Sequence, residues 1–133
     1  MVLVAAVALP TLPVLHLCNR FSTRRTLAAV AWMGRLPSPR IRCDPARVGR
    51  GVNGVARRLR MQGTTCLARS QLIWLLLSLC GRQPVIQVGA GAGLGAGALA
   101  HAWVELDGVP VADAADVAAV HPPFDRPLLG TAR

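Results

Sequence analysis

The chain of 133 residues contains no lysine and no tyrosine, so arginine supplies all 15 of its basic side chains. Without a lysine it cannot form a Walker A phosphate loop. Only six residues are acidic, and the formal net charge at pH 7 is +9. A surface of this charge should attract acidic peptides, nucleic acid or anionic lipid, unless the excess arginine is simply solvated. The few aromatic residues are not interleaved with the arginines, so we do not expect nucleic acid as a partner.

The cysteines exclude several classes of site. They are Cys18, Cys43, Cys66 and Cys80. No pair has C-x-x-C spacing and no cysteine–histidine cluster has zinc-finger spacing, so we expect no metal site. A disulfide framework is poorly motivated in a chain with 53% hydrophobic residues. We therefore expect reduced thiols in the cytoplasm, three of them structural and one reactive.

The segment Gly89–Gly97 alternates glycine with alanine or leucine, and all of its glycines lie at odd positions. A dinucleotide-binding fingerprint needs glycines at the first, third and sixth positions, which this parity excludes. We therefore interpret the segment as a flexible loop between strands, and no cofactor is expected.

The length suits one folding unit that can bury a core. We divide the chain into an apolar, helical N-terminal region at 1–39 and a main domain at 40–133. Within the main domain, Val52–Met61 is predicted to be a short basic helix and Pro84–Val88 a buried strand.

The N-terminal region is apolar but carries little targeting information. Pro10 and Pro13 interrupt the run Met1–Leu17, which has no basic start and no clear cleavage site. A signal peptide and a membrane span are therefore both poorly supported. The segment Arg24–Met33 predicts a helix that packs on its own domain. Contact of this region with a membrane surface or a partner is the alternative.

A strong helix is predicted from Cys66 to Cys80. Thr64 or Thr65 can cap its first turn, and Gly81 can end it. The helix is apolar around its whole circumference, which is typical of a helix in the core.

The segments Ala98–Glu105 and Val109–Asp113 predict two antiparallel strands around Asp107-Gly108. A two-residue turn would place Asp113 on the sheet face opposite to His101. A three-residue loop shifts the register by one residue and places the two side chains directly opposite each other. We therefore expect a three-residue loop and a hydrogen bond between His101 and Asp113.

Cys66, His101 and Asp113 supply a thiol, an imidazole and a carboxylate, a set that can cleave or transfer an acyl group without a metal. The first turn of a helix favours a thiolate at Cys66. His101 would accept the thiol proton and later protonate the leaving amine, while Asp113 would orient the imidazole. The backbone N–H of Cys66 could stabilise the oxyanion, with Gln62 as a candidate second donor. Each residue could be structural by itself; the combination favours catalysis.

The segment Cys66-Leu67-Ala68-Arg69-Ser70 resembles the C-L-x-R-S helix start of the lasso-peptide leader peptidases. Residues 100–113 resemble the A-H-A-W-V-E…D-G…D segment of the same family. These are transglutaminase-like cysteine proteases, the B-protein protease domain, from bacterial gene clusters for ribosomally made peptides. The resemblance runs from about Met61 to Phe124. Our predicted fold is α+β, with a cysteine-bearing helix packed on an antiparallel sheet, and the resemblance implies a transglutaminase-like or papain-like core.

The resemblance also implies roles and partners. Cys66 would be the nucleophile, His101 the general base and acid, and Asp113 the orienting carboxylate. The family removes the leader from a precursor peptide, and a separate ATP-dependent lasso cyclase then closes the ring. Leader recognition uses a small domain, either fused or separate; this chain looks too short to contain one, so we expect a separate recognition protein. The segment Gly89–Gly97 is longer than the resemblance leads us to expect, and it lacks polar side chains.

Two alternatives remain open at this stage. An acyltransferase or transglutaminase-type enzyme on the same fold would transfer the acyl group to an amine instead of water. A non-enzymatic basic module would bind nucleic acid or membrane without using the thiol. We expect a cytoplasmic protein, with membrane association through the N-terminal region as the open question.

Overall fold

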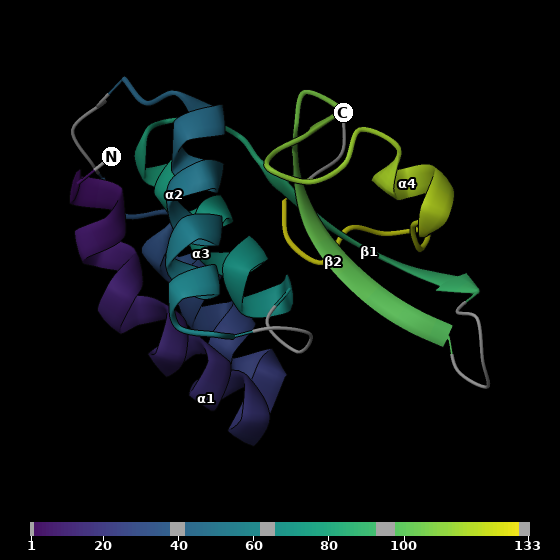
Figure 1. Ribbon diagram of the computed structural model, residues 1–133, viewed down its shortest axis with the longest axis horizontal. Helices are drawn as coiled ribbons and strands as arrows, with labels where there is room; N and C mark the ends of the chain where they lie inside the picture. Colours follow the sequence, from purple (N-terminus) through teal and green to yellow (C-terminus); the bar gives the residue numbers. More distant parts are fainter. Residues whose placement is uncertain (1, 38–41, 62–65, 93–97, 131–133) are drawn as a thin grey trace.

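The computed structural model describes residues 2–37, 42–61, 66–92 and 98–130, and it combines a helical layer with a small antiparallel sheet (Figure 1). In chain order the elements are α1 (Val2–Met33), α2 (Pro45–Arg58), α3 (Cys66–Leu79), β1 (Val85–Ala92), β2 (Ala98–Leu106), β3 (Val109–Pro110) and α4 (Val117–Val120). The three long helices lie on one side of the sheet, and the short α4 lies on the other (Figure 1). The predicted α+β fold with an N-terminal helical region is confirmed.

Helix α3 lies at the centre of the helical layer, between α1 and α2 on one side and the sheet on the other (Figure 1). Its buried apolar side chains are Ala68, Leu72, Ile73, Trp74, Leu75 and Leu77. The indole Nε1–H of Trp74 donates to the carbonyl oxygen of Pro84 at 2.8 Å, which ties the middle of α3 to the residue that precedes β1. The predicted core helix is confirmed; the proposed caps Thr64 and Thr65 lie outside the described residues.

Helix α1 continues through Pro10 and Pro13, the prolines that interrupt the apolar run of the sequence, and it consists of two helical limbs joined at a kink. Pro10 and Pro13 lie inside the helix and are exposed. A proline removes one N–H and frees the carbonyl four residues earlier. Here those carbonyls belong to Ala6 and Leu9, which lie on exposed parts of the helix, so water can satisfy them. The sharp bend occurs later, at Ser22, where φ is −163° and ψ is 96°.

The inner face of α1 is held by apolar packing and by one polar pair. Ala8, Leu12, Leu15 and Val30 are buried in the common core. Farther along, the amide of Asn19 exchanges two hydrogen bonds with the fully buried amide of Gln71 on α3, at 2.8 and 3.1 Å. Because a buried amide needs partners, this pair fixes the register of α1 on α3.

Helix α2 begins at Pro45, seven residues before the predicted start at Val52. The carboxylate of Asp44 caps it by accepting from the N–H of Ala46 at 3.0 Å, and proline suits the first helical position. The helix buries Val48, Val52 and Val55 and exposes Arg47, Arg50, Arg57 and Arg58. The basic character was predicted correctly, but the Asp-Pro start signal was missed.

Strand β1 extends through Gly89 to Ala92, so interpreting these residues as a flexible loop is wrong; residues 93–97 lie outside the described chain. The backbone of residues 120–122 passes directly over Gly89 and Gly91, and a Cβ at either position would collide with its carbonyl oxygens. The glycines are thus needed for close packing of two backbone segments. The later segment 123–129 continues along β1, with Phe124 donating to Val88 at 2.9 Å.

The hairpin between β2 and β3 has a two-residue turn and not the predicted three-residue loop. Leu106 pairs with Val109, and Glu105 pairs with Pro110. Asp107 and Gly108 have φ values of 53° and 77°. Two positive φ angles are typical of a type I′ turn, whose twist matches that of the strands. Aspartate tolerates this conformation, so the sequence Asp-Gly selects the tighter turn.

Candidate active site

His101 and Asp113 are joined by a hydrogen bond of 3.1 Å between Nε2 and Oδ2. A carboxylate only accepts, so Nε2 carries the proton and donates it in this contact. The other carboxylate oxygen, Oδ1, accepts from the N–H of Ala114 at 3.1 Å, which fixes the plane of the carboxylate. The predicted contact is therefore present, although the register predicted to produce it is not.

Asp113 reaches His101 because the chain leaves the ladder immediately after β3. The N–H of Val111 still donates to the carbonyl of Val104 at 2.8 Å, in register with the two-residue turn. Ala112 then adopts a left-handed backbone, with φ of 61°. This breaks the alternation that would otherwise point Asp113 to the opposite face. The expectation that a two-residue turn forbids the contact is wrong, since it assumed an uninterrupted strand.

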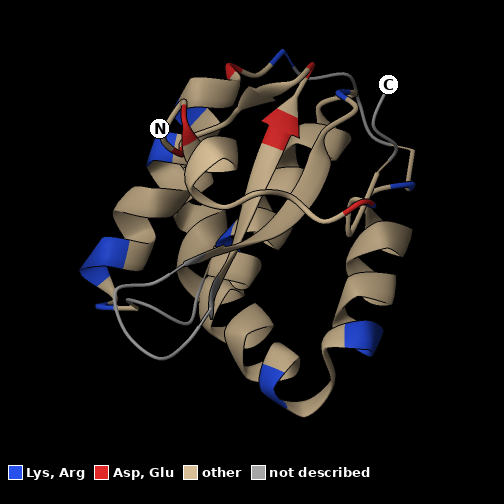
Figure 2. Cartoon of the chain, turned by 90° about the vertical axis from the view of Figure 1, so that its right-hand side faces the viewer, with Lys and Arg blue, Asp and Glu red and all other residues tan. Residues whose placement is uncertain are grey.

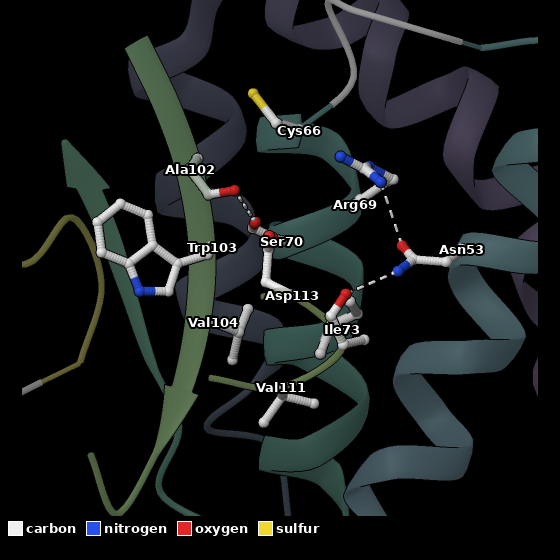
Figure 3. Close-up of a pocket in the computed structure, with 11 residues that line it drawn as sticks. Asn53, Cys66, Arg69, Ser70, Ile73, Ala102, Trp103, Val104, Val111 and Asp113 are labelled. Carbon is white, nitrogen blue, oxygen red and sulfur yellow. Dashed lines mark hydrogen bonds between the residues drawn. The ribbon is translucent and has the colours of Figure 1, made fainter. Parts of the chain in front are cut away.

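Two consecutive hydrogen bonds from α2 and α3 hold the backbone at Ala112. The side-chain amide of Asn53 on α2 donates to the carbonyl of Ala112 at 2.9 Å. Arg69 on α3 donates from Nη1 to Oδ1 of the same asparagine at 3.3 Å (Figure 3). A left-handed alanine is unfavourable by itself, so contacts like these are needed to maintain it. No sequence signal identified Asn53, because its partners lie 16 and 59 residues away.

The ring of His101 contacts two other aromatic rings. It stacks on Trp103, with centroids 6.2 Å apart and planes at 15°, and the ring of His121 lies 5.1 Å away. The indole N–H of Trp103 donates to Glu105 at 2.8 Å. Sequence analysis gave His121 no part beside His101. Its position follows from the return of the C-terminal segment over β1, which no local pattern indicates.

Cys66 occupies the first turn of α3, on the side of the helix that faces β2 (Figure 3). It borders a small cavity that Asp113, Ser70 and Ala102 also line. The hydroxyl of Ser70 donates to the carbonyl of Ala102 at 2.9 Å and so fixes α3 against β2 one turn below the thiol. The cavity measures about 10 Å³, roughly the room for one water molecule. Any substrate larger than a water molecule must therefore lie along its mouth.

Of the three predicted site residues, the structure joins His101 to Asp113 and places Cys66 beside the same cavity as Asp113. Within the described residues, no hydrogen bond links the Cys66 thiol to His101. Asp113 occupies Nε2, so Nδ1 is the ring nitrogen left to exchange a proton. Gln62, the candidate second oxyanion donor, lies outside the described residues.

The remaining cysteines lie away from this site. Cys18 is exposed on α1, whereas Cys80, just after α3, lies beside Cys43, just before α2. Burial raises the pKa of the Cys80 thiol to about 12, and a hydrogen bond with Cys43 and the charge of that thiol add to the effect. Arg82 acts in the opposite direction. Among the described residues, no three histidine, cysteine or acidic side chains lie close enough to hold a metal ion.

An imidazole oriented by Asp113, together with a helix-start thiol that borders the same cavity as Asp113, is an arrangement suited to acyl transfer through a thioester. No curated protein and no solved structure matches the chain. A family model does match it over residues 8–124, and that family is described as the transglutaminase-like superfamily. The match begins within α1 and extends through α2, α3 and the whole sheet, including the positions of Cys66, His101 and Asp113. The division of the chain at residue 39 stays a prediction. By this match the chain belongs to the transglutaminase-like superfamily.

Proposed function

We propose that this protein is a cysteine endopeptidase that removes the leader from a ribosomally made precursor peptide during lasso-peptide maturation. The observation that carries the proposal is the Nε2–Oδ2 hydrogen bond of His101 and Asp113, beside the cavity that Cys66 borders. The superfamily includes cysteine proteases and acyltransferases. The resemblance of residues 66–70 and 100–113 to the leader peptidases supports the protease within that range.

The first half of the proposed reaction forms a thioester. Nδ1 of His101 accepts the proton of the Cys66 thiol, and the sulfur attacks the carbonyl carbon of the scissile peptide bond. The carbonyl oxygen becomes an oxyanion, to which the backbone N–H of Cys66 can donate. When the tetrahedral intermediate collapses, the C–N bond breaks and Nδ1 returns its proton to the departing amine. The leader remains attached to Cys66 as a thioester.

The second half releases the leader. A water molecule attacks the thioester carbon while Nδ1 of His101 accepts one of its protons. Collapse breaks the C–S bond, the leader leaves as a carboxylate, and the thiol is restored. Asp113 stays ionised throughout and holds the ring by its bond to Nε2, which also stabilises the imidazolium formed in both halves.

The geometry sets one requirement on this mechanism. The Cys66 thiol has to approach Nδ1 of His101, a contact that the described residues do not make. Catalytic hydrogen bonds commonly tighten only when substrate is bound. A leader laid along the mouth of the cavity would lie against both α3 and β2, the elements that carry the two groups. A separate recognition protein that grips the leader fits this requirement, and we include it as a partner.

The decisive experiment mixes the protein with its precursor peptide and the recognition protein of the same gene cluster and follows product masses. The wild type should yield free leader and a core peptide with a new N-terminal amine. Cys66→Ala should yield neither, while Cys18→Ala, which removes an exposed thiol on α1, should cleave normally. Intact precursor with active partners, or cleavage by Cys66→Ala, would contradict the proposal. A conjugated product in place of a hydrolysed one would assign the protein to the acyltransferases.

A further inference from the structure

The outer face of α1 carries a continuous exposed apolar stripe. Leu3, Val7, Val14, Leu17 and Phe21 are all exposed, with Leu3 at 72% and Phe21 at 82%. Their positions are separated by three, four or seven residues, as is also true of Pro10, so they fall on one side of the helix. Water is a poor environment for such a stripe, which indicates a surface that is covered in use.

The stripe points away from the rest of the fold. The buried residues Ala8, Leu12 and Leu15 face α2 and α3, and at 100° per residue they lie on the side of α1 opposite to the stripe. In Figure 1, α1 lies on the far side of α3 from the sheet. A partner on the stripe would therefore leave the Cys66 cavity, between α3 and β2, open to solution.

Length and composition would allow α1 to cross a bilayer, but its packing argues against that. The helix Leu3–Met33 has 31 residues and a mean hydropathy of 1.4 in its most apolar window, of which 17% is buried. Its inner face belongs to the core, and Asn19 is paired with the fully buried Gln71. Crossing a membrane would break these contacts, whereas lying on its surface would keep them and cover the stripe.

Charge complementarity selects the kind of surface. The chain has no acidic residue before Asp44, whereas Arg20, Arg24 and Arg25 are exposed around the bend of α1. Figure 2 shows basic residues on both limbs of the bent helix, whereas acidic residues concentrate on the sheet and its connections. Arginine beside exposed apolar residues matches a layer of anionic headgroups over acyl chains.

The bend also creates an apolar groove of about 460 Å³. Val14, Cys18 and Phe21 line it from one limb of α1, and Ala29 and Met33 line it from the other. Arg25 also lines this groove, so a guanidinium stands beside apolar walls. That combination suits an acyl chain whose headgroup is negatively charged.

From these observations we propose that the outer face of α1 binds the surface of an anionic lipid bilayer, with the helix lying along the membrane plane and the Cys66 cavity facing solution. This inference does not depend on the proposed peptidase activity.

The test is flotation of the full-length protein with vesicles of phosphatidylcholine alone or with one quarter phosphatidylglycerol. We expect binding to the anionic vesicles that falls as salt is raised from about 0.1 to 1 M, because the Debye length shrinks. Leu17→Ser with Phe21→Ser should weaken binding by at least roughly tenfold, since apolar burial is lost. Changing Arg20, Arg24 and Arg25 to glutamine should weaken it by about fivefold per arginine.

Matched control variants distinguish binding through the outer face of α1 from non-specific binding through charge or exposed apolar side chains elsewhere. Phe124→Ser removes an exposed aromatic side chain elsewhere, and Arg57→Gln with Arg58→Gln removes two charges from α2; neither should change binding more than about twofold. Unchanged thermal midpoints would show that the variants fold. No binding to anionic vesicles, equal loss in the controls, or resistance of the cellular protein to alkaline extraction would overturn the proposal. So would a dimer that Phe21→Ser dissociates, because the stripe would then cover a second copy.

Discussion

Helices α1 and α3 are both rich in apolar side chains that do not gather on one face, and the two helices pack against each other. Nevertheless α3 is covered on every side, by α1, α2 and the sheet, whereas α1 is covered only on its inner face. Composition alone therefore does not determine burial; the number of elements that surround a helix does. Helix α3 begins with the candidate nucleophile, and the exposed face of α1 is the surface that we propose binds a lipid bilayer.

The largest effect should come from the carboxylate that orients the imidazole beside the start of α3. Asp113→Asn keeps the shape but replaces the acceptor of the Nε2 proton, so we expect kcat/KM to fall by about 10²–10⁴. Asp116→Asn is the matched control, because Asp116 makes no side-chain capping bond to α4 and is exposed. Precursor cleavage measured for both variants checks this. Equal rates for Asp113→Asn and the wild type would remove Asp113 from the mechanism.

The comparison of the helices predicts unequal stability effects for the same chemical change. Leu72→Ala in α3 deletes a fully buried side chain and should lower the free energy of unfolding by about 2–5 kcal/mol. Leu17→Ala in α1, where the side chain is 56% exposed, should change it by less than about 0.5 kcal/mol. Urea unfolding of both variants is the measurement. Similar losses at the two positions would mean that the outer face of α1 is buried in solution.

Two asparagines offer a finer comparison. Asn19→Ala breaks the pair between α1 and α3, whereas Asn53→Ala frees the Ala112 carbonyl. Both should lose about 1–3 kcal/mol of stability. Only Asn53→Ala should also lower kcat, by roughly tenfold, because the left-handed backbone before Asp113 then relaxes.

Adding Ala112→Gly to Asn53→Ala should recover part of that rate, since glycine adopts a positive φ without strain. A rate loss in Asn19→Ala as large as that in Asn53→Ala would assign the effect to stability alone.

The smallest effect concerns thiols and pH. Because the pKa of Cys80 is raised to about 12 from 9.0, its alkylation at pH 8 should be far slower than that of the exposed Cys18. Between pH 9 and 12 the unfolded chain releases this proton and the folded chain retains it, so stability should fall as pH rises through that window. The chain has no lysine or tyrosine to titrate there. Unfolding midpoints at pH 8 and 11 for the wild type and Cys80→Ala check the sign.

Sequence reasoning worked where one local pattern determined the outcome. The apolar run of α3 stops just before Gly81 and has the length of a core helix, and the Asp-Gly pair marks the turn that ends β2. Sequence reasoning was weaker where the structure of a segment depends on contacts with residues far away in the sequence. Residues 120–122 pass over the strand residues Gly89 and Gly91, and α1 continues through two prolines that lie on its exposed side.

The candidate site shows the same division. Residue types and the helix start indicated Cys66, His101 and Asp113, and the contact between the last two is present. The argument from register was wrong, because it could not include a left-handed residue that Asn53 stabilises from another helix. His121 was missed for a similar reason. Residues that support a site through long-range contacts have no characteristic spacing in the sequence, so a local pattern cannot detect them.

The left-handed backbone of Ala112, directly before Asp113, has a consequence for recognising relatives of this protein. When a left-handed residue redirects the main chain, the following aspartate can hydrogen-bond to the histidine without a fixed number of residues between the hairpin turn and the aspartate. Searches that require strict alternation after the turn will discard such proteins, whereas searches for an aspartate within a few residues of a short second strand will retain them.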